Sequence, residues 1–68
     1  MAENLPKEER KSQIMEAAMK VFTRKGYSNA RMDDIVETSG LSKGAIYHHF
    51  ESKKEIFISL IKLIKIDL

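Results

Sequence analysis

The hydrophobic positions of this chain recur at helical spacing and show no strand-like alternation. In the first segment, apolar residues stand at i, i+3, i+4, i+7 and i+8, on one stripe of an α-helix: Ile14, Ala17, Ala18, Val21 and Phe22. Pro6 suits the first turn of this helix, and Lys25 followed by Gly26 suits its last turn and a left-handed cap. The pattern predicts an amphipathic helix that ends at Gly26, with Tyr27 folding back as the capping hydrophobe.

A second, shorter helix is expected next. Its apolar face consists of Met32, Ile35 and Val36. The acidic pair Asp33 and Asp34 favours a helix N-terminus through the macrodipole. Asn29 is able to cap the start, whereas Ala30 and Arg31 are not, which leaves this boundary open by a residue or two.

The turn that follows is clearly marked. Gly40 can take a positive φ, Leu41 can pack into the core, and Ser42 can cap the next helix. Two short helices joined by a tight turn with glycine match the helix-turn-helix pattern, here over residues 31–50.

The third helix separates its side chains into two faces if it starts at Lys43. Ile46, His49 and Phe50 lie together at i, i+3 and i+4 and are expected to close the core. The outward face carries hydrogen-bond donors and a bare patch of backbone: Lys43, Gly44, Tyr47 and His48. Such a helix is about 11 Å long, comparable to the roughly 12 Å width of a DNA major groove, and can enter it by its N-terminal end.

A fourth helix opens with a capping box, in which Ser52 and Glu55 satisfy each other's backbone donors. Its apolar residues cover far more than one face: Ile56, Phe57, Ile58, Leu60, Ile61, Leu63, Ile64, Ile66 and Leu68. A lone surface helix would not tolerate this excess. Either these residues are the N-terminal part of a longer protein, or self-association buries the exposed stripe.

Composition narrows the class of protein. Sixty-eight residues make one domain at most, which buries only about 60% of its unfolded surface. Cysteine is absent, so disulfides and thiolate metal sites are excluded. The first residues lack an apolar stretch of signal-peptide length, and Ser59, Lys62 and Lys65 interrupt the longest apolar region, so a soluble, cytoplasmic protein is expected. The net charge of +2 and the pI near 9.0 slightly favour binding to polyanions.

The outward groups of the third helix suit DNA. Ser42 and the backbone N–H groups of Lys43 and Gly44 form a helix N-terminus that can cradle a phosphate. Lys43 can reach a guanine edge or a phosphate, and Tyr47 and His48 can donate to backbone oxygens on the groove wall. Lys53 and Lys54 place two cations in the first turn of a helix, where each opposes the macrodipole by about 0.3–1 kcal/mol. A nearby phosphate would explain why cations stand at this unfavourable place.

The stretch GYSNARMDDIVETSGLSKGAIYHHFESKKEIF resembles the DNA-binding domain of the tetracycline-repressor (TetR) family of bacterial transcriptional regulators. The matching features are Gly26-Tyr27, Asp34-Ile35, Gly40-Leu41-Ser42, Gly44, Tyr47, His49-Phe50 and Lys53. The family usually has threonines where Ala30 and Arg31 stand, and Arg31 could supply a phosphate contact in another way. The resemblance implies an all-α, three-helix helix-turn-helix (homeodomain-like) domain over residues 8–68, which includes the start of the fourth helix.

The resemblance also implies a function and partners. The chain would be the head of a repressor-type homodimer that binds a pseudo-palindromic operator. A C-terminal domain, absent from this chain, would bind a small-molecule effector and dimerise. The implied DNA-binding residues are Arg31, Ser42, Lys43, Gly44, Ala45, Tyr47, His48, His49 and Lys53.

The sequence also allows other interpretations, each with less support from the residues. A small helical protein-interaction module would dock through the fourth helix and leave the third helix structural; its binding would not fall steeply with salt as DNA binding does. Tyr47 could be a rim aromatic, and His49 on the core face could be a partly buried histidine. A metal site is not expected, because adjacent helical residues such as His48 and His49 diverge by about 100°. No nucleophile stands with a base and no phosphate loop is present, so neither an enzyme nor a cofactor is expected.

Overall fold

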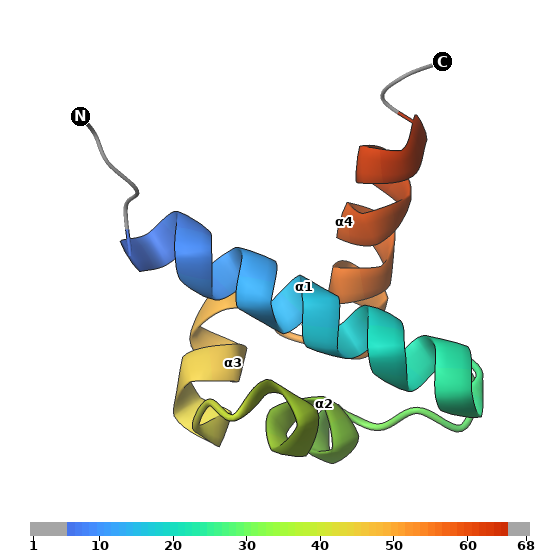
Figure 1. Cartoon of the computed structure of the whole chain (residues 1–68), viewed down its shortest axis with the longest axis horizontal. Coiled ribbons are helices and arrows are strands. Elements are labelled where there is room, and N and C mark those ends of the chain that lie inside the picture. Colours follow the sequence, from blue (N-terminus) through green and yellow to red (C-terminus); the bar gives the residue numbers. More distant parts are fainter. Residues whose placement is uncertain (1–5, 66–68) are drawn as a thin grey trace.

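Four helices make up the part of the chain that the structure, a computed structural model, describes: residues 6–65, with side chains over residues 9–64. They are α1 (Pro6–Lys25), α2 (Met32–Ser39), α3 (Lys43–His49) and α4 (Lys53–Lys65), and no strand lies between them. Helix α1 runs across the molecule, α2 and α3 lie along one side of it, and α4 projects away on the other side (Figure 1). The expected all-α architecture is confirmed.

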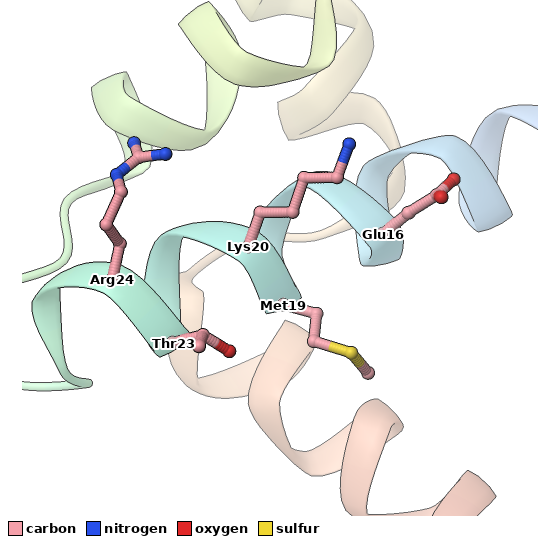
Figure 2. A pocket seen from close by; sticks show the side chains of 5 residues that line it. All are labelled: Glu16, Met19, Lys20, Thr23 and Arg24. Carbon is pink, nitrogen blue, oxygen red and sulfur yellow. The ribbon is translucent and has the colours of Figure 1, made fainter.

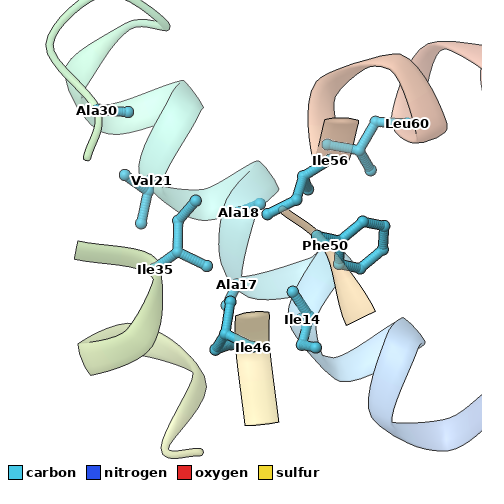
Figure 3. Close-up of a cluster of buried hydrophobic side chains, with 10 residues drawn as sticks. All are labelled: Ile14, Ala17, Ala18, Val21, Ala30, Ile35, Ile46, Phe50, Ile56 and Leu60. Atoms are coloured by element: carbon cyan, nitrogen blue, oxygen red, sulfur yellow. The ribbon is translucent and has the colours of Figure 1, made fainter. Parts of the chain in front are cut away.

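Each helix contributes one fully buried isoleucine to a single core (Figure 3). These are Ile14, Ile35, Ile46 and Ile56. The remaining buried members of the core are Ala17, Ala18, Val21, Ala30, Phe50 and Leu60. The stripe predicted on α1 is therefore the face that packs, with Phe22 half-buried at its edge. Sequence reasoning missed Ala30, because a single alanine between helices adds nothing to a periodic pattern.

The end of α1 takes the predicted left-handed cap. Gly26 has a φ of 83°, and its N–H donates to the Phe22 carbonyl oxygen at 2.8 Å. The Tyr27 ring folds back so that its centroid lies 5.5 Å from that of Phe22. The Phe57 ring of α4 packs against both, with its centroid 4.9 Å from that of Tyr27 and 5.7 Å from that of Phe22. These three aromatic residues connect the end of α1, the following loop and α4.

The start of α2 differs from the cap that Asn29 offered. The N-cap is Arg31, with a φ of −124°, and the Asn29 amide instead donates to the Lys25 carbonyl at 3.2 Å. Asp34 Oδ2, inside the first turn, accepts the Arg31 N–H at 3.0 Å, and Asp34 Oδ1 lies 3.2 Å from Lys25 Nζ. The Lys25 ammonium and then the Arg31 N–H lower the pKa of Asp34 below its usual value. The Asp34 carboxylate thus satisfies the N–H of the N-cap residue, as the second half of a capping box does, although Arg31 has no side-chain acceptor to supply the first half.

The turn between α2 and α3 has the predicted geometry. Gly40 has a φ of 76°, in the left-handed region. Ser39 Oγ accepts the Leu41 N–H at 3.0 Å, and Leu41 packs, partly buried, against the core. Ser42 is the N-cap of α3, and its Oγ accepts the Ala45 N–H at 3.1 Å. The short turn thereby fixes the angle at which α3 leaves α2.

Helix α4 buries Ile56 and Leu60 against the core. Ser52 Oγ accepts the Glu55 N–H at 3.3 Å as predicted, but the Glu55 carboxylate accepts the N–H of Glu51, at 2.9 Å, and not that of Ser52. Beyond the buried Ile56 and Leu60, large apolar side chains are open to solvent: Phe57, Ile58, Leu63 and Ile64. The excess apolar surface predicted for this helix is therefore present. Ile66 and Leu68, counted in that prediction, lie outside the described residues.

Candidate nucleic-acid interface

Helix α3 presents the two faces that its spacing predicts. Ile46 is fully buried and Phe50 is 5% exposed, whereas Tyr47 is 42% exposed and His48 is also exposed. The helix ends at His49, and Phe50 is its C-cap, with an extended backbone and its N–H donated to the Ile46 carbonyl at 2.9 Å. Buried Ile46 and Phe50 thus fix the roll of the helix about its axis.

The N-terminal tip of α3 is accessible. Ser42, Lys43 and Gly44 are exposed, and Ala45 is half-buried behind them. Apart from the adjoining residues and the nearby backbone of α3, no heavy atom lies within 4 Å of the position that a Cβ on Gly44 would occupy. The backbone at this point can therefore be approached closely by another molecule.

Lys43 has an acidic neighbour that sequence reasoning did not pair with it. Its Nζ lies 3.6 Å from Asp33 Oδ1, and both side chains are mostly exposed. The turn at Gly40 brings these residues together from different helices, so no local spacing indicates the pair. Arg31, the N-cap residue of α2, is a further exposed cation.

Lys53 is placed differently from the other candidate residues. Its Nζ donates to the carbonyl oxygens of Tyr27 at 2.6 Å, Ala30 at 3.0 Å and Ser28 at 3.3 Å. It also lies 4.3 Å from the centre of the Tyr27 ring. These carbonyls compensate for the unfavourable place of the ammonium in the first turn of α4, so its presence there does not require a phosphate. A contact of Lys53 with DNA stays a prediction.

The two histidines do not converge on one point. The His48 and His49 rings lie edge to face with centroids 5.1 Å apart, His48 exposed and His49 half-buried. Within the described residues, no three His, Cys, Asp or Glu side chains come close enough to hold a metal ion. Over the same residues, no helix is both long and apolar enough to cross a membrane.

One surface hollow lies on α1. It is lined by Glu16, Met19, Lys20, Thr23 and Arg24. In Figure 2, Lys20 and Arg24 point toward one side of α1 while Met19 points away from them. Side chains that diverge in this way do not form a catalytic constellation, so the exposed face of α3 stays the strongest candidate site.

Residues 14–60 of the chain match the model of the family described as bacterial regulatory proteins, tetR family. The chain belongs to the TetR family. Among its curated relatives, it is 41% identical over 58 residues to the HTH-type transcriptional activator FasR of Mycolicibacterium smegmatis, covering 85% of this chain and 26% of FasR. It is 40% identical over 53 residues to the HTH-type transcriptional repressor AcnR of Corynebacterium diphtheriae, covering 78% of this chain and 28% of AcnR.

The chain is also 45% identical over 56 residues to the uncharacterized HTH-type transcriptional regulator YfiR of Bacillus subtilis, covering 82% of this chain and 27% of YfiR. The chain thus spans about a quarter of the length of these relatives. They include an activator and a repressor, so membership of the TetR family does not fix the direction of regulation. The resemblance found in the sequence is confirmed, and a DNA-binding regulator is favoured over an interaction module.

Proposed function

We propose that this chain is the DNA-binding head of a TetR-family regulator and that α3 enters the major groove of an operator by its N-terminal end. The observation that carries this proposal is the exposed tip of α3, oriented from behind by Ile46 and Phe50. Its seven residues rise about 11 Å, which fits a groove roughly 12 Å wide.

The exposed residues divide into two roles. Arg31, Ser42 and the backbone of Gly44 contact phosphates, and Tyr47 and His48 donate to the sugar-phosphate wall. Lys43 reads a base edge or a phosphate, and the Ala45 methyl meets a base at the groove floor. His49 lies at the edge of this surface. Lys53 differs from these residues, because its Nζ donates to carbonyls inside the protein.

Partners follow from the architecture of regulators in this family. The full-length protein acts as a homodimer on a pseudo-palindromic operator, with half-sites about 34–36 Å apart or a multiple of it. A small-molecule effector binds a C-terminal domain, and the regulator works in the cytoplasm as a repressor without enzymatic activity. A single head contacts one half-site, so this chain alone should bind an operator more weakly than the full-length dimer.

Selection of bound duplexes from a randomised DNA pool, followed by titration at several salt concentrations, tests the function. Loss of a phosphate contact lowers the slope of log affinity against log salt by about 0.9, and loss of a good base contact costs about 1–3 kcal/mol of discrimination. Lys43→Ala should show one or both effects. Lys62→Ala, an exposed lysine far along α4, is the matched control and should show neither.

Two results would contradict the proposal. If Lys43→Ala behaves like Lys62→Ala, α3 does not meet DNA. If the unmodified chain shows no salt-dependent binding to duplex DNA, the interaction module that docks through α4 becomes the better explanation.

A further inference from the structure

The Lys53 ammonium joins two parts of the chain that are remote in sequence. Its acceptors lie in the loop between α1 and α2, 23 to 26 positions away. An ammonium has three N–H donors, and three carbonyls lie within hydrogen-bond distance. We propose that Lys53 is a positioning residue for DNA binding, which holds the start of α2 in place, and that it is not a phosphate contact. The proposal rests on the proposed DNA-binding function.

The loop offers the ammonium a concentrated negative potential. The carbonyls of Tyr27 and Ser28 follow the C-terminal end of α1, where the helix macrodipole is negative. The loop is itself folded tightly, since the Ala30 N–H donates to the carbonyls of Gly26 at 3.1 Å and Tyr27 at 3.2 Å. A compact cation fits this convergent set of oxygens better than a planar guanidinium does.

The contact to Ala30 closes a ring around the helix-turn-helix. Residues 30–53 contain α2, the turn and α3. The Nζ of Lys53, the last residue of this segment, donates to the carbonyl of Ala30, the first. These hydrogen bonds must break before the segment can open, so they raise the free energy of opening.

Neighbouring contacts strengthen the link on both sides of the loop. One turn after Lys53 on α4, the Phe57 ring packs on Tyr27 with centroids 4.9 Å apart. On the α2 side, Asp34 bonds the Arg31 N–H at 3.0 Å. Arg31 and the first turn of α2 are thus located relative to α4 before any DNA is bound.

Loss of this link has a specific consequence for binding. When only a fraction of the molecules hold α2 in place, the apparent affinity for DNA falls to that fraction of its full value. The number of phosphates neutralised does not change, so the salt dependence of binding stays the same. A phosphate contact behaves in the opposite way, because its removal flattens the salt dependence.

The test compares Lys53→Met and Lys53→Arg with Lys54→Met, which removes the same charge from the adjacent, exposed residue. DNA affinity is measured over a salt series at a temperature where circular dichroism shows each variant folded. Amide hydrogen exchange at Ala30 reports on the loop without DNA.

For Lys53→Met we expect an affinity about tenfold lower, an unchanged salt slope and exchange at Ala30 about tenfold faster. Lys53→Arg should lose affinity in the same direction, whereas Lys54→Met should leave Ala30 exchange unchanged. If Lys53→Met does not fold, the affinity, salt slope and Ala30 exchange of Lys53→Arg are compared with those of Lys54→Met instead.

The proposal is overturned if Lys53→Met lowers the salt slope by about 0.9 while Ala30 exchange stays slow, or if Lys53→Arg keeps full affinity, since arginine serves a phosphate at least as well. If the unmodified chain fails to bind DNA, the proposed function falls. The exchange rate at Ala30 still decides whether Lys53 holds the loop.

Discussion

Gly40 and Gly44 stand four positions apart in the chain but adopt different backbone conformations. Gly40 has a φ of 76°, in the left-handed region, whereas Gly44 lies in the first turn of α3. At both positions, no heavy atom beyond the adjoining residues and the local helix backbone lies within 4 Å of where a Cβ would be. An alanine therefore meets no other part of the protein at either position, and local backbone preference decides its effect on stability.

The two substitutions should change stability in opposite directions. Gly40→Ala places an L-residue in the left-handed region, at a cost of about 1–2 kcal/mol. Gly44→Ala removes the conformational freedom of a helical glycine and should stabilise by up to about 0.5–1 kcal/mol. In a domain of this size, each kcal/mol shifts the melting temperature by about 4–8 °C.

Thermal unfolding followed by circular dichroism measures both variants against the unmodified chain. Gly40→Val should destabilise more than Gly40→Ala because of its β-branch, and Gly40→Asn should destabilise least because asparagine tolerates this region. Equal melting temperatures for Gly40→Ala and Gly44→Ala would refute the argument from backbone conformation.

Other substitutions probe the remaining contacts. Phe50→Ala should cost about 3–5 kcal/mol of stability, whereas Tyr47→Phe should keep the fold and weaken DNA binding; circular dichroism and a binding titration separate them, and the reverse result means that the faces of α3 are misassigned. The lowered pKa of Asp34 makes its contribution to stability complete above about pH 4 and lost as the pH falls further. In urea titrations, Asp34→Asn should therefore destabilise the domain clearly at about pH 7 and much less at about pH 2. Asp33→Asn removes the negative partner of Lys43, so affinity for any duplex should rise and its salt dependence should steepen; a fall in affinity would show that the Asp33 carboxylate aids binding.

Sequence reasoning succeeded where structure depends on local spacing. The faces of α3, the left-handed glycine at position 40 and the Ser42 cap all involve residues within four positions of one another. Helical periodicity and capping chemistry act over that range, so the sequence carries the information directly.

The differences concern choices between groups of similar reach. The Glu55 carboxylate accepts the N–H of Glu51, one residue before the predicted donor Ser52. At the start of α2, where the boundary was left open, the N-cap is Arg31 and not Asn29. Small differences in backbone direction decide such choices. The link from Lys53 was not foreseeable for another reason: its acceptors are backbone carbonyls, which every residue possesses and which therefore leave no mark in a sequence.

The four isoleucines at the centre of the core bear on how this domain selects DNA. A β-branched side chain in a helix has one strongly preferred χ1 rotamer, so Ile14, Ile35, Ile46 and Ile56 give the core few alternative packings. Under the proposed function, the backbone that carries the exposed face of α3 would then lose little conformational entropy on binding, because the core already holds it in place. A backbone that does not adapt would leave the deformation to the duplex, and operators would be selected partly by how easily their base steps bend to meet α3.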